Sequence, residues 1–413
     1  MSNIQRLKFP IFKNNPTLVY LDSASTTQKP RAVIKAETDF YSKYNANVHR
    51  GVYGIAVKAS TAYENVREKT AAFIGAADKK EIIFTSGATA SINLVAQSFL
   101  APQLQVGDEI IISAMEHHAN LIPWQQVCLQ KKAVLRIIPI NENGSLELDI
   151  YEKLLNVKTK LVALTHISNT LGTINPIKEI IEAAHLKNIP VLIDAAQSIA
   201  MHDYGNIEAD FLVFSAHKLF GPTGVGILYA KAKHLEKMQP IQFGGDMVRD
   251  VAFERTIFAP SPHRFEAGTP NVAGVIGLGA AIDFVNKIGR KNIFEHSQRL
   301  LHVAEEKLGN IKGVKIIGSR MSETIRDTKP EIRHPKSAII SFLIGDVHPH
   351  DAATILAQRN ICIRAGQHCT QPLMDFFNLP ATLRASFSIY NSEEDIDKLM
   401  EGIEEVKRVM KFK

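Results

Sequence analysis

Short apolar runs alternate with helical patterns between about residues 80 and 230, and this alternation restricts the chain to few folds. Runs rich in valine and isoleucine occupy residues 81–87, 108–113, 134–140, 160–168, 190–196, 210–216 and 225–230. Most of them lack polar–apolar alternation, as expected for strands buried on both faces. Helical patterns separate several runs; the one at 176–188 begins with Pro176, a residue favoured in a first helical turn. The pattern predicts an α/β fold with a mostly parallel sheet between helices.

The character of the sequence changes after residues 264–271. A long helical pattern at 272–288 leads into further helices and a few strands, of which 337–345 is the clearest. We therefore predict a large α/β domain over 17–279 and a smaller α+β domain over 280–413, with residues 1–16 packing back on it. The polar segment 318–335 has two prolines and no periodic apolar face, which predicts a loop or mobile insertion.

Composition excludes several classes of function. The net charge of +6 is modest for 413 residues, and the basic residues are spread along the chain, which argues against nucleic-acid binding. We read no export signal at the N-terminus, and no apolar run approaches the roughly 18 residues of a membrane span. Three cysteines without a C-x-x-C spacing favour a reduced, cytoplasmic protein with no metal site. Of these, Cys128 and Cys362 have the surroundings of core thiols.

The stretch "FSAHKLFGPTGVG" places Lys218 before a run of glycines. A P-loop would end in Gly-Lys-Ser/Thr, and a dinucleotide fingerprint would lead from a strand into a helix, so neither motif fits. Asp194 ends a buried apolar run 24 residues earlier, one strand along, which should bring both groups to the same sheet edge. An aspartate there is also a common helix cap or structural ion partner. A lysine and an aspartate together are the pair that pyridoxal phosphate requires.

The phosphate of such a cofactor needs an anion site. Residues 84–99 form a strand, a Ser-Gly-Ala-Thr turn and a helix, so Ser86 and Thr89 lie at a helix start where N–H groups favour an anion. A helix cap alone explains these two residues equally well. Ser215 and His217 flank the lysine motif as further donors. His117 follows another strand and is suited to stack on a pyridine ring, but the adjacent His118 leaves the choice between them open.

Nine motifs in order resemble the cysteine desulfurases of class V, fold-type I pyridoxal phosphate enzymes, most closely the group II, SUF-type enzymes. They are "LDSASTTQKP", "NVHRGVY", "MEHHANLIPWQ", "THISNTLGT", "IDAAQS", "FSAHKLFGPTGVGILY", "RFEAGTPN", "IRAGQHCTQPLM" and "RASFSIYN". The resemblance covers nearly the whole chain. It implies a fold-type I transferase, with a mostly parallel mixed sheet in the large domain and a smaller α+β domain.

The resemblance also assigns cofactor contacts. Lys218 would form the imine, Asp194 would face the pyridine nitrogen, and His117 would stack on the ring. The other cofactor-binding positions are Gln197 at the phenolic oxygen, Asn169 nearby, Ala88, Thr89, Ser215 and His217 at the phosphate, and Thr269 from the second subunit of a homodimer. The substrate carboxylate would be held by Arg384, with Arg364 and Asn169 beside it and His49 near the substrate.

Cys369 would be the sulfur acceptor. The resemblance implies that its thiolate takes the sulfur of L-cysteine as a persulfide and that alanine is released, with His368 and Arg364 favouring the thiolate. The sequence departs from the family pattern at Ala216, at Ala88 and Ala90, where threonine and glutamate are frequent, and at Gln367. These changes put cofactor affinity, communication between subunits and local proton transfer in question.

Taken together, the expectation is a homodimeric desulfurase that supplies sulfur for iron–sulfur cluster assembly through a SufE-like or SufU-like carrier protein. L-selenocysteine is an alternative substrate, because the same site would cleave either bond. Another class V enzyme, such as a transaminase, would not need the Cys369 loop. A non-catalytic scaffold that binds sulfur carriers would not need Lys218 and Asp194 together.

Overall fold

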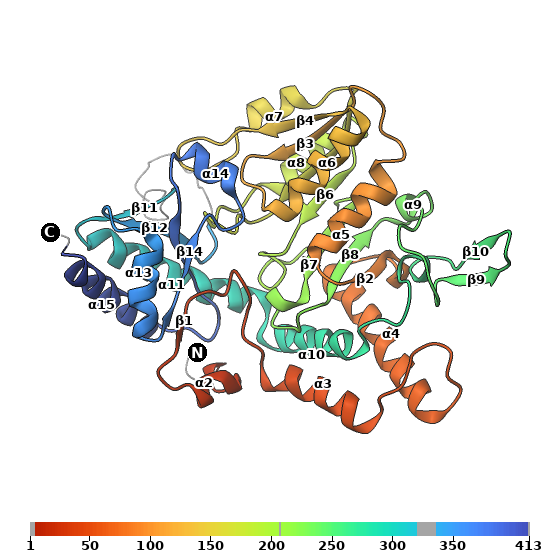
Figure 1. Cartoon of the computed structure of the whole chain (residues 1–413), viewed down its shortest axis with the longest axis horizontal. Helices are drawn as coiled ribbons and strands as arrows, with labels where there is room; N and C mark the ends of the chain where they lie inside the picture. Colours follow the sequence, from red (N-terminus) through yellow and green to blue (C-terminus); the bar gives the residue numbers. More distant parts are fainter. Residues whose placement is uncertain (1–4, 206–207, 320–335, 412–413) are drawn as a thin grey trace.

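The computed structural model describes residues 5–205, 208–319 and 336–411. They form a large α/β part and a smaller part beside it (Figure 1). Nearly all of the predicted loop at 318–335 lies outside the described residues.

Seven strands form the sheet of the large part, in the order β2-β8-β7-β6-β5-β3-β4. Their bounds are β2 Ile82–Thr85, β3 Glu109–Ser113, β4 Val134–Ile138, β5 Thr159–Thr165, β6 Val191–Asp194, β7 Phe211–Ser215 and β8 Gly226–Ala230. Strands β3 to β7 pair in parallel, whereas β8 runs antiparallel to its neighbours β7 and β2. Each strand coincides with one of the seven apolar runs, so the predicted mostly parallel mixed sheet is confirmed.

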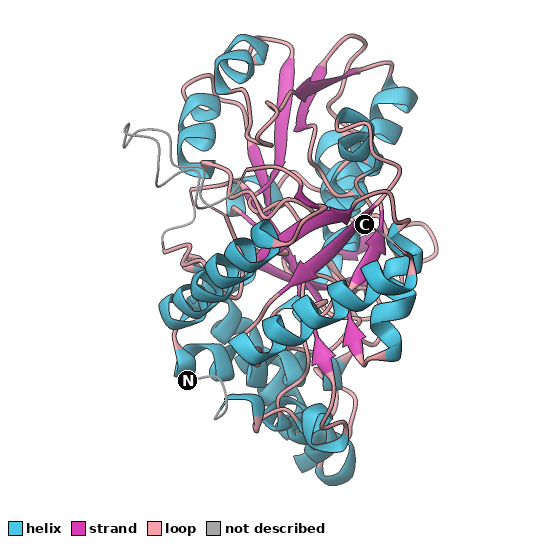
Figure 2. Cartoon of the chain, turned by 90° about the vertical axis from the view of Figure 1, so that its left-hand side faces the viewer, coloured by secondary structure: helices cyan, strands magenta, loops and turns pink. Residues whose placement is uncertain are grey.

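The two faces of this sheet belong to separate hydrophobic cores. Ile110 and Ile112 of β3 enter one core, which also contains Trp124, while Ile111 enters the other together with residues of α4 and α10. Figure 2 shows the strands enclosed by helices. Burial on both faces explains why the strands carry no polar–apolar alternation in the sequence.

The helices of the large part are α3 Arg31–Lys43, α4 Gly54–Ile74, α5 Ala88–Leu94, α6 Ile122–Lys131, α7 Leu148–Leu154, α8 Ile177–His185, α9 Ala232–Leu235 and α10 Val272–Ile288. Helix α5 continues as a stretch of π-helix to Leu100. Helix α10 has the bounds predicted from the sequence and packs against α3 and α4. Within the described residues no single helix is long and apolar enough to cross a membrane; α10 and the following helix pass that test only as a pair bent by 74°.

The smaller part contains an antiparallel sheet with the order β11-β12-β15-β14. Its strands are β11 Val314–Ile316, β12 Ile339–Ile344, β14 Arg364–Gly366 and β15 Thr382–Ser386, and its helices are α11 Arg290–Asn310, α13 Pro349–Gln358, α14 Gln371–Phe376 and α15 Glu393–Val409. A third hydrophobic core lies between this sheet and the helices α11, α13 and α15. The division into domains stays a prediction, since the proposed boundary after residue 279 lies inside α10.

The beginning of the described chain packs against its end. Helix α2 (Pro10–Asn14) follows Phe9, whose ring contacts those of Tyr390 and Phe284. Arg6 forms an ion pair of 3.1 Å with Asp395. Strand β1 (Val19–Tyr20) pairs in parallel with β13 (Ile361–Cys362). The residues that precede the large sheet therefore hold the smaller part in place.

A hairpin of β9 (Val248–Val251) and β10 (Thr256–Phe258) extends away from the body of the large part (Figure 1). Its tip carries Phe253, which is fully exposed, and the nearby Phe243 is 70% exposed.

Candidate active site

A cavity of about 230 Å³ lies where the carboxyl ends of the central strands meet the smaller part. Parallel strands of an α/β sheet form their ligand sites at this edge. The residues that the sequence assigned to the site line this cavity, apart from Ser86, His49 and Thr269; Ser86 lines a neighbouring cavity.

Lys218 and Asp194 come to the cavity from neighbouring strands. Asp194 is the last residue of β6, and Lys218 ends the 3-10 turn η4 (Ala216–Lys218) that follows β7. Burial lowers the pKa of Lys218 to about 8, although Asp194 acts in the opposite direction. Burial also raises the pKa of Asp194, opposed by a hydrogen bond of 2.9 Å from the Ala196 N–H and by the charge of Lys218. The pair thus combines a reactive amine with a buried carboxyl group.

The start of α5 forms an anion cradle beside this pair. The Oγ of Ser215 accepts a hydrogen bond of 2.8 Å from the Ala88 N–H, which ties the end of β7 to the helix start. A Cβ atom on Gly226 would lie 2.4 Å from the backbone of Gly87, so the start of β8 approaches the residue before α5 as closely as glycine alone permits. His217 adds a ring whose pKa burial lowers to about 4, so it is neutral and can donate to a phosphate.

The two adjacent histidines have different surroundings. His117 lines the cavity, and its Nδ1 accepts a hydrogen bond of 3.0 Å from the Ala119 N–H, so its ring proton resides on Nε2. Burial, and then the charge of Lys218, lower its pKa to about 3. His118 instead contacts the loop of Cys369 through its backbone N–H. Of the two rings, that of His117 is the one beside the lysine.

Two arginines reach the cavity from adjacent strands of the smaller sheet. Arg364 of β14 and Arg384 of β15 are partners in the strand register. Arg384 is 2% exposed and donates to the Asn169 carbonyl at 2.9 Å, while its Nε has no partner within the described residues. Both guanidinium groups donate to the Oγ of Ser25, at 2.7 and 2.8 Å. A buried guanidinium with a free donor is suited to bind a carboxylate.

Cys369 lies in the turn between β14 and α14 and is half-buried. The Nδ2 of Asn169 donates to the His368 carbonyl at 2.8 Å, so the side chain of Asn169 holds the Cys369 turn while its backbone carbonyl accepts a bond from Arg384. Gln197 lines the same cavity and donates to the Ala24 carbonyl at 2.8 Å. The thiol, the lysine and the arginines therefore border one space.

His49 and Thr269 lie elsewhere in the same chain. The ring of His49 contacts Glu64 and Asp246 at 3.1 and 3.0 Å, and Thr269 is exposed. Their predicted roles at the substrate and the phosphate stay predictions.

Asp22 and Ser25 were missed as site residues by the sequence reasoning. The Nη2 of Arg384 donates to the Asp22 carboxylate at 2.9 Å, and Ser25 connects Arg384 with Arg364. Both belong to the motif "LDSAS", where an aspartate directly after an apolar pair was the available signal.

These residues fit pyridoxal phosphate. A buried lysine of lowered pKa can bind the aldehyde, a buried aspartate can face the pyridine nitrogen, and a cradle with Thr89, Ser215 and His217 can hold the phosphate. Arg384 also lines the cavity, and its buried Nε has no hydrogen-bond partner within the described residues, so its guanidinium group can bind the carboxylate of an amino acid.

Comparison with known proteins agrees with this arrangement. The family model "Aminotransferase class-V" matches residues 19–399. The chain is 47% identical to a probable cysteine desulfurase of Halalkalibacterium halodurans, covering 97% of this chain and 96% of the relative, and 43% identical to a cysteine desulfurase of Shigella sonnei, covering 98% of each.

Solved structures give the same result. The cysteine desulfurase CsdA of Escherichia coli superposes with a TM-score of 0.90 at 37% identity, covering 99% of both chains. A cysteine desulfurase from Thermococcus onnurineus also has a TM-score of 0.90, at 35% identity over 97% of this chain and 96% of that one. The chain therefore belongs to the pyridoxal-phosphate-dependent class V aminotransferase family and, within it, to the cysteine desulfurases.

Proposed function

We propose that the enzyme converts L-cysteine to L-alanine and takes up the sulfur as a persulfide on Cys369. The observation that carries this proposal is the position of the Cys369 turn on the same cavity as Lys218, Asp194 and Arg384. A transaminase would need the lysine and the arginine but no thiol at this place.

Each group has a role that follows from its surroundings. Arg384, oriented by Asp22 and Ser25, binds the substrate carboxylate. Lys218 holds the cofactor and, once released from it, is the amine placed to move a proton at the substrate. His117 stays neutral and presents its Nε2–H to the cavity, which orients bound groups. When bound, the cofactor supplies an electron sink for negative charge next to the amino-acid α-carbon.

Sulfur transfer needs no external oxidant. The Cys369 thiolate forms an S–S bond with the substrate sulfur while the substrate C–S bond breaks, and the electron pair of that bond stays with the carbon fragment. That fragment takes up a proton and leaves as alanine. The balance is one thiol and one cysteine consumed for one persulfide and one alanine formed.

The test compares Cys369→Ser with a matched control, Cys362→Ser. Both cysteines are half-buried, but Cys362 lies in β13, outside the lining of the cavity. We expect Cys369→Ser to keep the cofactor and bind cysteine but to release no alanine, whereas Cys362→Ser remains active. Mass spectrometry of the unmodified enzyme should find the persulfide on Cys369. Full turnover of Cys369→Ser, or a persulfide on Cys128 or Cys362, would contradict the proposal.

Selenocysteine is the second candidate substrate. Selenium leaves carbon more readily than sulfur does, so the Cys369→Ser enzyme should retain activity on selenocysteine while losing it on cysteine. Measuring alanine release from both substrates separates the two activities. A non-catalytic scaffold is disfavoured because Lys218 and Asp194 border the same cavity.

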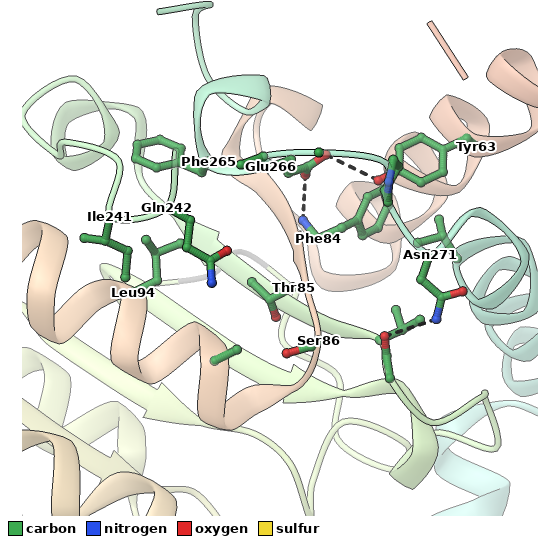
Figure 3. A pocket seen from close by; sticks show the side chains of 17 residues that line it. Tyr63, Phe84, Thr85, Ser86, Leu94, Ile241, Gln242, Phe265, Glu266 and Asn271 are labelled. Atoms are coloured by element: carbon green, nitrogen blue, oxygen red, sulfur yellow. Dashed lines mark hydrogen bonds between the residues drawn. The ribbon is translucent and has the colours of Figure 1, made fainter. Parts of the chain in front are cut away.

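We also propose a homodimer whose interface includes the surface next to the site. A second cavity, of about 330 Å³, is lined by Ser86 and Ala90, the neighbours of the Ala88 and Thr89 that line the first cavity. Figure 3 shows Ser86 in this second cavity together with Phe265 and Asn271 from the segment that contains Thr269. Sedimentation velocity should give twice the mass of one chain, and Thr269→Ala should weaken phosphate binding across the interface.

We further propose that the persulfide passes to a SufE-like or SufU-like carrier for iron–sulfur cluster assembly. The three cysteines are free thiols in the structure, which suits the reducing cytoplasm where we expect the enzyme to act. Alanine release with and without each carrier would show which of them accelerates turnover.

A further inference from the structure

The turn that carries Cys369 has an unusual backbone. Gly366 has a φ of 128°, and the two non-glycine residues His368 and Cys369 have φ values of 54° and 57°. Side chains make this left-handed region unfavourable, and two such residues in succession are rare. A turn of this kind keeps its shape only if groups outside it hold it.

His118 contacts the turn at Cys369 itself and again two residues later. Its backbone N–H donates to the Cys369 carbonyl at 2.8 Å, and its Nε2 accepts a hydrogen bond of 3.3 Å from the Gln371 N–H. Gln371 is the first residue of α14, so this N–H is one of the donors that a helix start leaves without a partner in its own helix. The imidazole thus caps α14 from the loop that follows β3.

The two adjacent histidines therefore have different contacts. His117 lines the cavity, whereas the ring of His118 contacts the first residue of α14, two residues after Cys369. Two further bonds, from Asn169 to the His368 carbonyl and between the hydroxyls of Thr170 and Thr370, hold the turn from the loop that follows β5. Of the two bonds made by His118, only the one at Nε2 depends on the side chain, so a substitution isolates it.

We propose that His118 is a positioning residue for sulfur transfer, whose imidazole keeps the strained turn in the conformation that presents the Cys369 thiol to the cavity. This inference rests on the proposed desulfurase function. It concerns the step at the thiol and leaves the binding of cofactor and substrate unchanged, because the His118 ring is not part of the cavity lining.

The experiment compares two variants of the holoenzyme. His118→Phe keeps a flat ring but has no acceptor, while His118→Gln supplies an acceptor oxygen at a similar reach. With dithiothreitol as sulfur acceptor, we expect His118→Phe to lower kcat for alanine release about fivefold to tenfold, the effect of one lost hydrogen bond, with KM unchanged. His118→Gln should recover most of kcat. His302→Phe, at an exposed position on α11, is the control.

A second measurement does not depend on turnover. Deuterium exchange of the peptide containing the Gln371 N–H should be faster in His118→Phe and close to normal in His118→Gln. A loss of kcat without faster exchange, or faster exchange with unchanged kcat, would overturn the positioning role. Loss of the visible cofactor absorbance would also overturn it. If the unmodified enzyme released no alanine from cysteine, the proposed function would fail, and the exchange data would still decide whether His118 holds the turn.

Discussion

The hydroxyl group of Ser25 is the contact shared by Arg364 and Arg384, the two arginines that we propose bind the substrate. Its Oγ accepts hydrogen bonds from Arg364 at 2.7 Å and from Arg384 at 2.8 Å, and donates to Asp22 at 2.7 Å. Ser25→Ala removes all three bonds and changes no charge. The variant therefore measures what orientation alone contributes to binding the carboxylate.

The expected loss of kcat/KM in Ser25→Ala follows from these contacts. A hydrogen bond to a charged group contributes about 1.5–3 kcal/mol. Arg384 keeps its bonds to Asp22 and to the Asn169 carbonyl, and water can reach the half-buried Arg364, so the lower end of that range applies. A loss of about 1.5 kcal/mol corresponds to roughly a tenfold lower kcat/KM. Because the carboxylate is bound both before and during reaction, the change should appear in KM.

The assay is alanine release over a range of cysteine concentrations. Ser42→Ala is the control, because Ser42 is exposed on α3 and its hydroxyl donates to the Thr38 carbonyl of the same helix. An unchanged kcat/KM in Ser25→Ala would refute the reasoning that Ser25 orients the arginines. A fall in kcat at constant KM would refute it as well, since the hydroxyl would then act on the reaction itself.

Three further outcomes follow from the lysine and the aspartate. Lys218→Ala should lose the visible cofactor absorbance and all turnover, and reduction with borohydride followed by peptide mapping should place the cofactor on Lys218 and on no other lysine. Asp194→Asn should fold normally but lose activity by about a hundredfold or more, the scale on which a preorganised charged contact acts; near-normal rates would make Asp194 structural only. The rate at which cofactor-free protein takes up pyridoxal phosphate should rise with pH and level off above pH 8, because the neutral amine of Lys218 becomes the major form there. A rate that still climbs at about pH 10 would indicate an ordinary lysine.

The sheet and its functional edge could be predicted because strands buried on both faces have continuous apolar sequences. The apolar runs became strands, and the polar residues that end them, such as Asp194, became cavity residues. The helix at 272–288 was equally predictable, since a long apolar pattern between Asn271 and Gly289 has clear ends.

The remaining site features depend on contacts between distant segments, which local patterns do not carry. Nothing near Ser25 indicates that two arginines more than 300 positions away will share its hydroxyl. The choice between His117 and His118 depends on contacts with a distant segment, since the His118 ring accepts a bond from the Gln371 N–H while His117 lines the cavity. The left-handed conformation of Cys369 could not be predicted from the sequence, because such positions are usually occupied by glycine and the bonds that hold Cys369 come from other loops.

The pairing of the first described residues with the last has a consequence during synthesis on the ribosome. The strands of the large sheet have all been made by residue 230, whereas Arg384, the partner of Asp22 and Ser25, is made about 154 residues later. At about 5–20 residues per second this interval is roughly 8 to 30 seconds. During this interval Lys218 and Asp194 have been synthesised, but the carboxylate site still lacks Arg384. The enzyme can therefore acquire its cofactor pocket before it can hold a substrate, and becomes active only when its translation is almost complete.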